Sequence, residues 1–386
     1  MSNNKKIDNN SDTETSEESL GGLNESSENE VNESALFENN SEIWELEPMN
    51  GNYDPKKLDV FEENTKYKDY FSKEESYNVA VQSKKKENFV FSITMSPNDE
   101  ESIYVLCHSK EKSVLKEIST TDFEISLLRK MFCQGYDTNE ILKNFNKSLD
   151  GSKYSICSNE KEDNEILIME KTGNATQFKI GVLYVGEGQT KETDFLSNQE
   201  GSSAWNEFLE ILGDKVTLKG WEGYNGGLNT KKDRGGKESY FTKWKDYDIM
   251  YHVSTLLPYS EKDPQQVIKK KHIGNDVVVI IFIDGNQKYN PESLKSKQNH
   301  ILIAVKPIII NEETKYHVEV LTKTNVPKYE PQLPNPPIFN QDQIRDFILT
   351  KACQGERVAQ KTGQFLERYL RFREAVVNKI VNRYIK

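Results

Sequence analysis

The longest uninterrupted apolar run of the chain, Val277–Ile283, most narrows the folds that this sequence can adopt. Its seven residues are far fewer than the roughly 18–20 that a helix needs to cross a bilayer. A run without polar positions is typical of a strand that is covered on both faces of its sheet. We therefore expect a soluble domain built around a central sheet with helices on both sides.

From about residue 197, helical patterns alternate with further apolar strands. This alternation predicts an α/β domain over residues 197–386, with a central mixed sheet and helices at its C-terminal end. The expected strands cover residues 249–254, 277–284, 301–310 and 316–321. The expected helices cover residues 202–212, 264–272 and 341–353, and a long segment that follows Gly355 and runs to Tyr384.

The segment before it, residues 49–196, is expected to form a separate, sheet-rich unit, which makes the fold class of the whole chain α/β of the α+β kind. Strand patterns occupy residues 88–94, 102–108, 165–170 and 177–185. Helical patterns occupy residues 121–132 and 138–145. No acid, base and nucleophile group together here, so we expect a structural or association domain.

Acidic residues are concentrated at the N-terminus. Residues 1–47 contain 13 acidic and two basic residues, a balance of −11 that equals the net charge of the whole chain. Because this segment is rich in Ser, Asn, Glu and Thr, we expect residues 1–48 to be a disordered acidic tail. Residues 48–386 hold 49 acidic and 49 basic residues, and without a net positive field, nucleic-acid binding is not expected.

Cysteine and histidine patterns give no metal site. The four cysteines have no Cys-x-x-Cys spacing, and the five histidines have neither the His-x-x-x-His nor the zinc-finger spacing. The N-terminal residues lack the apolar stretch of a secretory signal. We therefore expect reduced thiols, a cytoplasmic location, and no metal or cofactor of the protein's own.

A short helix before the apolar run has both of its ends marked in the sequence. Asp263 can cap it, Pro264 suits its first position, Gln266 is placed for a capping box, and Gly274 is a stop signal. Its last turn carries Lys269, Lys270 and Lys271. These lysines either stabilise the helix through its dipole or contact a partner.

The polar pair Asn275-Asp276 lies directly between this helix and the buried strand. An asparagine amide does not titrate, so Asn275 is not a candidate general base, but it can donate and accept hydrogen bonds at once. It can therefore orient a water molecule or contact a phosphate oxygen. The alternative is that Asn275 forms only a turn.

The residues around this pair resemble a known family. The stretch Lys270–Val278, preceded by Ile249–Tyr259, closely resembles the catalytic domain of Rap-type GTPase-activating proteins, which include tuberin and the spine-associated Rap GAPs. The same likeness extends to residues 208–213, 226–228, 325–327 and 347–351. Residues 67–71, 77–78, 179–184 and 188–190 resemble the N-terminal dimerisation domain of that family.

The resemblance implies that this chain activates a Rap-like small GTPase by inserting a catalytic asparagine, the Asn thumb, into the nucleotide site of the GTPase. Asn275 is the matching position, and its amide would orient the attacking water. His272 and Asp276 would support the thumb or touch the partner, and Lys269, Lys270 and Lys271 would contact acidic residues or phosphates.

The resemblance also implies the setting in which the protein acts. The GTP and Mg²⁺ belong to the partner GTPase. The sheet-rich unit would form a homodimer, and membranes would be reached only indirectly, through the lipidated GTPase.

Two departures from the family pattern bear on partner choice. Lys271 stands where many members carry arginine, which keeps the charge but loses the bidentate geometry. Asn229 stands where aspartate is common. These changes are expected to alter affinity or substrate preference rather than the chemistry.

Two other motifs are alternatives to the asparagine. Arg234 lies in a glycine-rich loop, where an arginine finger would also be found, but the family motif has no arginine there. The segment Gly236–Ser239 is similar to part of a P-loop, yet Glu238 replaces the hydroxyl residue that the motif requires. The chain itself is not expected to bind GTP.

The C-terminal helix carries an excess of positive charge, including Arg371 and Arg373. Its apolar stripe has helical spacing and predicts core contact. The basic side chains lead to the hypothesis that this helix borders the partner interface.

The leading hypothesis is thus a GTPase activator that supplies a residue in trans. The alternative is a non-catalytic scaffold or effector that binds a small GTPase through the same fold. An independent hydrolase would need a titratable acid–base group, and none can be assembled from the sequence.

Overall fold

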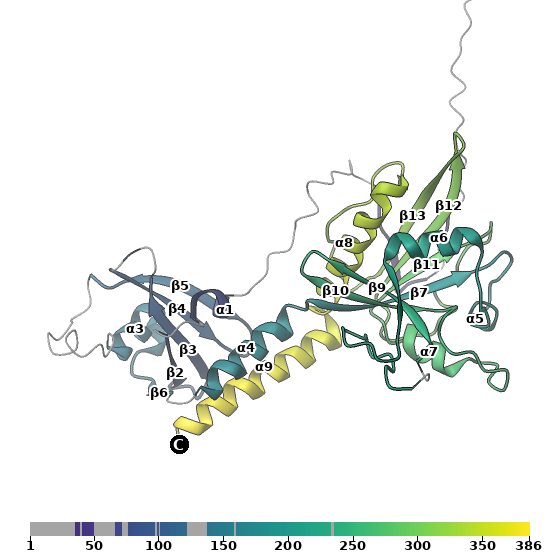
Figure 1. Ribbon diagram of the computed structural model, residues 1–386. Coiled ribbons are helices and arrows are strands. Elements are labelled where there is room, and N and C mark those ends of the chain that lie inside the picture. The colour runs from purple at the N-terminus through teal and green to yellow at the C-terminus, as the bar shows by residue number, and fades with distance from the viewer. Residues whose placement is uncertain are drawn as a thin grey trace, which may run out of the picture. The chain divides into compact units, whose positions relative to one another are not determined.

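The computed structural model describes residues 35–38, 41–49, 66–71, 76–96, 99, 101–121, 137–157, 160–232 and 235–386. These residues form two β-sheets with helices packed on them (Figure 1). Within these ranges, no helix is long and apolar enough to span a membrane.

The larger sheet is mixed, as predicted for the C-terminal region. Its strand order is β1-β13-β12-β11-β7-β10-β9-β8, and β14 pairs with β13. The central strands β10, β7, β11 and β12 pair in parallel, whereas the pairings outside them are antiparallel. The strands are β1 (Trp44–Leu46), β7 (Gln177–Val185), β8 (Asp214–Thr217), β9 (Glu238–Trp244), β10 (Tyr247–Val253), β11 (Val278–Ile283), β12 (Ile301–Ile310), β13 (Glu313–Lys323) and β14 (Ile338–Phe339).

Strand β11 is buried on both faces, which confirms the interpretation of the apolar run. Ile280 and Phe282 point into one apolar core, which α6 (Ser203–Leu212) and α8 (Gln341–Ala359) cover. Val279, Ile281 and Ile283 point into the opposite core, to which α5 (Glu192–Leu196) and α7 (Val267–Ile273) contribute. The period of two along a strand places alternate residues on opposite faces, so one uninterrupted apolar segment serves both cores.

The smaller sheet is antiparallel, in the order β5-β4-β3-β2-β6. It comprises β2 (Tyr77–Gln82), β3 (Asn88–Met95), β4 (Ser102–His108), β5 (Ser113–Ser119) and β6 (Lys153–Ile156). On one face packs α3 (Thr138–Phe145), which a 3₁₀ turn (Lys147–Leu149) follows. On the other pack α1 (Lys66–Phe71), α4 (Lys161–Gly173) and α9 (Gly363–Tyr384).

The predicted boundary between residues 196 and 197 does not separate the two sheets. Strand β7 lies at the centre of the larger sheet, although it precedes the boundary, and α9 packs on β2, β3 and α4, although it follows the boundary. Sheet membership depends on pairing between distant segments, which a local pattern does not reveal.

Two local predictions are corrected by helices. Residues 165–170, predicted as a strand, lie within α4, where Ile166 and Met169 are buried at helical spacing. The predicted break between two helices at Gly355 is wrong, because α8 continues through this residue to Ala359. A Cβ at Gly355 would lie 2.4 Å from Ile301 Cδ1, so this glycine allows close packing. The predicted helix 121–132 lies outside the described residues, apart from Thr121.

The tail predicted for residues 1–48 is wrong for its last part. Leu36, Phe37 and Trp44 are buried in the core of the larger sheet. Trp44 belongs to β1, which pairs with β13. Residues 1–34 and 39–40 lie outside the described part of the chain. These three residues are among the few apolar ones of the polar segment, and they anchor its described part to the sheet.

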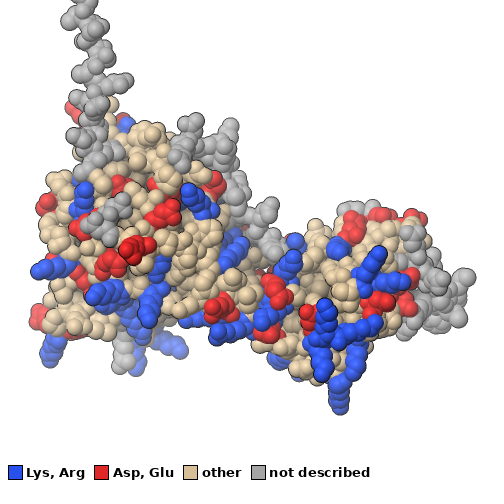
Figure 2. Space-filling view, turned by 180° about the vertical axis from the view of Figure 1, so that it is seen from behind, with Lys and Arg blue, Asp and Glu red and all other residues tan. Residues whose placement is uncertain are grey.

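Basic and acidic side chains are mixed over the face shown in Figure 2. This distribution agrees with the balance of acidic and basic residues beyond the N-terminal segment. Recognition of a partner on this face would therefore depend on local side chains rather than on a broad field of one sign.

Candidate functional site

Helix α7 begins later than predicted. It covers Val267–Ile273, three residues beyond the expected start at Pro264, and it ends directly before Gly274, as expected. Gln266 adopts a left-handed conformation with φ of 47°. The Asp263 carboxylate accepts a hydrogen bond of 2.8 Å from the first backbone N–H of α7. Asp263 thus closes a turn that precedes the helix.

The three lysines of α7 have different environments. Lys269 is fully buried, and its Nζ donates a hydrogen bond of 2.6 Å to the Asn198 carbonyl. Burial lowers the pKa of Lys269 to about 8. Lys270 pairs with Glu192 at 2.8 Å, and Lys271 is exposed. The predicted partner contact is therefore wrong for Lys269, which instead holds the helix in place, while Lys271 faces solvent.

Asn275 is exposed at the end of α7. Its side-chain Nδ2 donates a hydrogen bond of 2.6 Å to the Lys271 carbonyl, and its backbone N–H donates to the His272 carbonyl at 3.0 Å. One N–H of the amide is thus used within the turn. An amide has a second N–H and a carbonyl oxygen with which it can bind a ligand or a water molecule.

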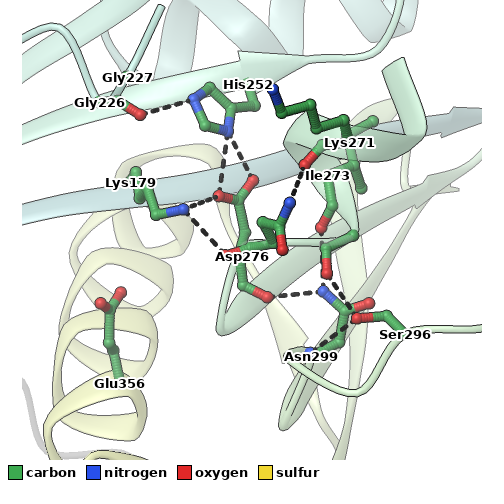
Figure 3. A network of polar contacts seen from close by, with 12 residues as sticks. Lys179, Gly226, Gly227, His252, Lys271, Ile273, Asp276, Ser296, Asn299 and Glu356 are labelled. Carbon is green, nitrogen blue, oxygen red and sulfur yellow. Dashed lines mark hydrogen bonds and ion pairs between the residues drawn. The ribbon is translucent and has the colours of Figure 1, made fainter. Parts of the chain in front are cut away.

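Side chains from other segments hold four consecutive carbonyl groups, those of residues 273–276, which we call the Asn275 turn (Figure 3). Asn299 Nδ2 donates to the first and the last of these carbonyls, at 3.0 and 2.6 Å. Ser296 Oγ donates to the Gly274 carbonyl at 2.5 Å, and Lys179 Nζ donates to the Asn275 carbonyl at 2.9 Å. The backbone beneath the exposed amide is therefore fixed in position.

Asp276 is fully buried beneath the turn. Its carboxylate oxygens lie 2.8 and 3.0 Å from His252 Nδ1, and one of them lies 3.4 Å from Lys179 Nζ. Burial raises the pKa of Asp276, and the nearby His252 and Lys179 oppose this rise. Asp276 thus supports the turn and is not accessible to a partner.

His272 packs against His252, with ring centroids 4.8 Å apart. Burial is the main cause that lowers the pKa of His272, to about 4, and the neighbouring cationic groups add to it. The ring is therefore neutral at pH 7. It packs at the end of α7, and its roles in supporting the thumb or touching the partner stay predictions.

A buried acid on α8, Glu356, lies near the same cluster (Figure 3). Gln360 Nε2 donates to its Oε1 at 3.0 Å. Burial, and then the charge of Asp276, raise the pKa of Glu356 to about 8, against the effect of Lys179.

The two predicted arginines of α9 are not part of this cluster, because α9 contacts β2, β3 and α4. Arg373 is 4 % exposed, and its guanidinium donates to the carbonyls of Ser109 and Lys110. The predicted partner contact is therefore wrong for Arg373. Arg371 is exposed and lies 3.4 Å from Glu367, and its contact with a partner stays a prediction.

Of the two alternative motifs, the segment Gly236–Ser239 lies within the described residues, and Arg234 lies outside them. Glu238 begins β9, so the fragment that was compared with a P-loop leads into a strand. The Asn229 side chain accepts hydrogen bonds from the backbone of Lys231 and Lys232 and thereby closes a loop turn. In the described part of the chain, no cluster of three or more His, Cys, Asp or Glu residues is arranged to hold a metal ion.

Comparison with known proteins now identifies the domain. The family model described as Rap/ran-GAP matches residues 195–374. The chain contains a Rap/ran-GAP domain. It is 38% identical over 220 residues to the human GTPase-activating Rap/Ran-GAP domain-like protein 3, covering 56% of this chain and 22% of that protein.

Two further matches have the same character. A PH and Rap-GAP domain-containing protein of Dictyostelium discoideum is 36% identical over 240 residues, which are 62% of this chain and 20% of that protein. A solved structure described as the TSC2 GAP domain is 31% identical and covers 46% of this chain and 94% of its own length, with a TM-score of 0.43. The chain thus spans less than a quarter of the length of these curated relatives.

The Rap/ran-GAP match contains Asn275, Asp276, His252 and Asn299 but begins after β7, which supplies Lys179. Sequence reasoning missed the roles of Lys179, His252, Ser296 and Asn299. Lys179 and His252 stand within the segments that carried the resemblance, and this was the available signal. Ser296 and Asn299 precede β12 in an irregular segment, so no local pattern marks them.

Proposed function

We propose that this protein is a GTPase-activating protein that accelerates GTP hydrolysis on a Rap-like small GTPase by supplying Asn275 in trans. The observation that carries the proposal is the exposed Asn275 amide on a turn whose four carbonyls are all held by side chains. The Rap/ran-GAP match and the names of the relatives support the choice of a small GTPase as partner.

An amide suits this chemistry because phosphoryl transfer depends mainly on positioning and electrostatics. The Asn275 oxygen would accept a hydrogen bond from the attacking water, and the N–H that is not bound to Lys271 would donate a hydrogen bond to the water or to a phosphate oxygen. The nucleotide and the Mg²⁺ would be those of the GTPase. The rigid turn would limit the motion of the amide during the reaction.

The exposed Lys271 would add a positive charge beside the amide. Lys270 is partly buried and paired with Glu192, so it would reach the partner only after leaving that ion pair. A charge near the phosphates favours the transition state more strongly once water is excluded from the interface.

Single-turnover GTP hydrolysis by purified Rap, Ras and Rheb tests the proposal. We expect acceleration of Rap by the protein and its loss with Asn275→Ala. Asn206→Ala is the matched control, because Asn206 is an exposed asparagine on α6, outside the cluster. Circular dichroism and a binding measurement would show whether the Asn275→Ala variant keeps its fold and its affinity.

The second candidate function is a scaffold or effector that binds a GTPase without accelerating hydrolysis. Measurable binding to GTP-loaded Rap, with no acceleration of any of the three GTPases, would favour it. An Asn275→Ala variant that fails to fold would instead show that this residue is a structural turn.

We also propose that the smaller sheet mediates a homodimer. The protein would be cytoplasmic and would reach membranes through its lipidated partner. Strand β6 ends the order of this sheet within the described residues, and it exposes Tyr154 and Ile156. Sedimentation equilibrium with Ile156→Lys tests the dimer. An unchanged molecular mass would contradict this surface.

A further inference from the structure

His252, at the end of β10, joins two segments of the chain that both have exposed residues. Its side chain is buried and lies between Asp276 and the loop that contains Gly226 (Figure 3). Nδ1 lies 2.8 Å from one oxygen of Asp276, and Nε2 lies 3.1 Å from the carbonyl oxygen of Gly226. A single ring thus bridges residues that are 50 positions apart in the sequence.

The chemistry of the two contacts fixes how the ring is used. A backbone carbonyl only accepts, so the Nε2 atom must carry a hydrogen and donate it to Gly226. Nδ1 shares a proton with the Asp276 carboxylate. Asp276 in turn contacts Lys179, which also holds the Asn275 carbonyl. The ring is therefore connected to the turn that presents the Asn275 amide.

The other end of the bridge is equally constrained. Gly226 has a φ of 60°, and a Cβ there would lie 3.1 Å from the Met250 side chain and 3.3 Å from Lys179 Cβ. The loop is thus seated against β10 and β7. Asn225 Oδ1 accepts a hydrogen bond of 2.9 Å from the Gly227 N–H, which fixes the peptide group that contains the Gly226 carbonyl.

We call residues 225–232 the Gly226 loop. It presents exposed residues beyond the carbonyl that His252 holds, namely Gly227, Asn229, Lys231 and Lys232. Two of these are cations, and the Asn229 side chain organises the backbone of both. The loop therefore carries two exposed cations in the segment that follows the carbonyl held by His252.

We infer that His252 is a positioning residue that fixes the Asn275 turn and the Gly226 loop relative to each other, so that both contact the same GTPase. This inference rests on the proposed function. The turn would act on the rate of hydrolysis, and the loop would act on the affinity for the partner. A histidine that only fills the core would not need to join two segments that both lead to exposed residues.

Two substitutions separate the two sides of the ring, because an asparagine amide lies about where Nδ1 lies and a glutamine amide reaches about as far as Nε2. His252→Gln keeps a donor for Gly226 and loses the contact with Asp276. We expect kcat to fall about tenfold, with the half-saturating GTPase concentration within about twofold. His252→Asn keeps the contact with Asp276 and loses the hydrogen bond to the Gly226 carbonyl. We expect the half-saturating concentration to rise about five- to tenfold, with kcat within about twofold.

His317→Gln is the matched control, because His317 is also a buried histidine but lies on β13. It shows what the loss of a buried imidazole does to the whole fold. Both His252 variants could instead change kcat and the half-saturating concentration together, by the same factors as His317→Gln. That result would overturn the inference and show that His252 is structural.

Thermal melting identifies any His252 variant that fails to fold. Two other variants then replace the His252 variants. Asp276→Asn changes the Asp276 side of the ring and should lower kcat. Asn225→Ala changes the Gly226 loop and should raise the half-saturating concentration. A common loss of both constants in these two variants would also overturn the inference.

A binding measurement keeps the inference distinct from the proposed function. If the wild-type protein does not accelerate hydrolysis, the dissociation constant is measured with Rap that carries a fluorescent non-hydrolysable GTP analogue. Weaker binding of about five- to tenfold for His252→Asn, and not for His252→Gln, supports the positioning of the loop. Equal weakening by both variants contradicts it.

Discussion

Helices α7 and α9 carry basic residues that the sequence predicted to face a partner, and the structure uses them differently. In α7, Lys269 points inward, Lys270 is paired with Glu192, and Lys271 alone of the three is exposed. In α9, the guanidinium of Arg373 is buried against backbone carbonyls of the smaller sheet. Positive charge in the sequence therefore does not distinguish a partner contact from a packing contact.

What distinguishes the end of α7 is its backbone. The carbonyls of the Asn275 turn are all held by side chains from β7 and from the segment before β12. Such an arrangement places one exposed amide accurately, which is what a positioning role in catalysis requires. The contacts of α9 instead secure a helix on a sheet, which is a stability role.

The largest effect is expected for Lys179→Met. This change removes the hydrogen bond to the Asn275 carbonyl and the ion pair with Asp276. We expect kcat of GTPase activation to fall about a hundredfold, because a small misplacement of a positioning group is costly. Single-turnover hydrolysis measures it.

Lys215→Met is the control for this change, because Lys215 forms an exposed ion pair with Glu238 on β8 and β9. It should leave the rate unchanged. Full activity of Lys179→Met, or an equal loss in both variants, would show that the anchoring of the Asn275 turn does not matter for the reaction.

Arg373→Met tests the other side of the comparison. It leaves the carbonyls of Ser109 and Lys110 without their donor. We expect the free energy of unfolding to fall by about 2 kcal/mol, with unchanged activation per folded molecule. Urea unfolding and the hydrolysis assay measure the two quantities, with the exposed Arg368→Met as control. A loss of activation without a loss of stability would show that Arg373 contacts the partner after all.

The sequence predicted the larger sheet because its evidence is local. The apolar run marked β11, further apolar segments marked its neighbours, and Gly274 marked the end of α7. The place of β7 in the same sheet was not predictable, because a strand pattern does not state which strand it pairs with. Strand β1 was missed for a related reason, since its partner β13 lies far along the chain.

The same division holds for the site. Asn275 stood out because a polar pair between a helix stop and a buried strand is unusual, and because of the family resemblance. Its support was not visible, because Lys179 and Asn299 reach the turn from other segments. The direction of the Lys269 side chain, which faces inward, was also not predictable from a run of three lysines.

A smaller effect is expected for Glu356→Gln, which should change how the free energy of unfolding depends on pH. Glu356 is 6 % exposed, and its pKa is raised from 4.5 to about 8. The folded state therefore keeps a proton that the unfolded chain releases as the pH rises above 4.5. The stability that this proton gives is complete below that value and is lost as the pH approaches 8. Relative to Glu356→Gln, the free energy of unfolding of the wild type should fall by about 1 kcal/mol per pH unit in this window.

Urea unfolding of both proteins at pH 5, 6, 7 and 8 measures this slope. Glu367→Gln is the control, because Glu367 is an exposed acid on α9 and its profile should run parallel to that of the wild type. Parallel profiles for the wild type and Glu356→Gln would mean that Glu356 is ionised in the folded protein throughout this range.

The smallest effect is expected for Arg371→Glu, which tests whether α9 borders the partner. The Arg371 side chain is 77% exposed and pairs with Glu367 of its own helix. An exposed charge contributes little to affinity, and salt screens it. If an acidic surface of the GTPase lies opposite α9, the charge reversal should weaken binding about two- to threefold at low salt and have no effect at high salt. The same affinity for both proteins at low salt would exclude Arg371 from the interface and leave the Asn275 turn and its neighbours as the recognition surface.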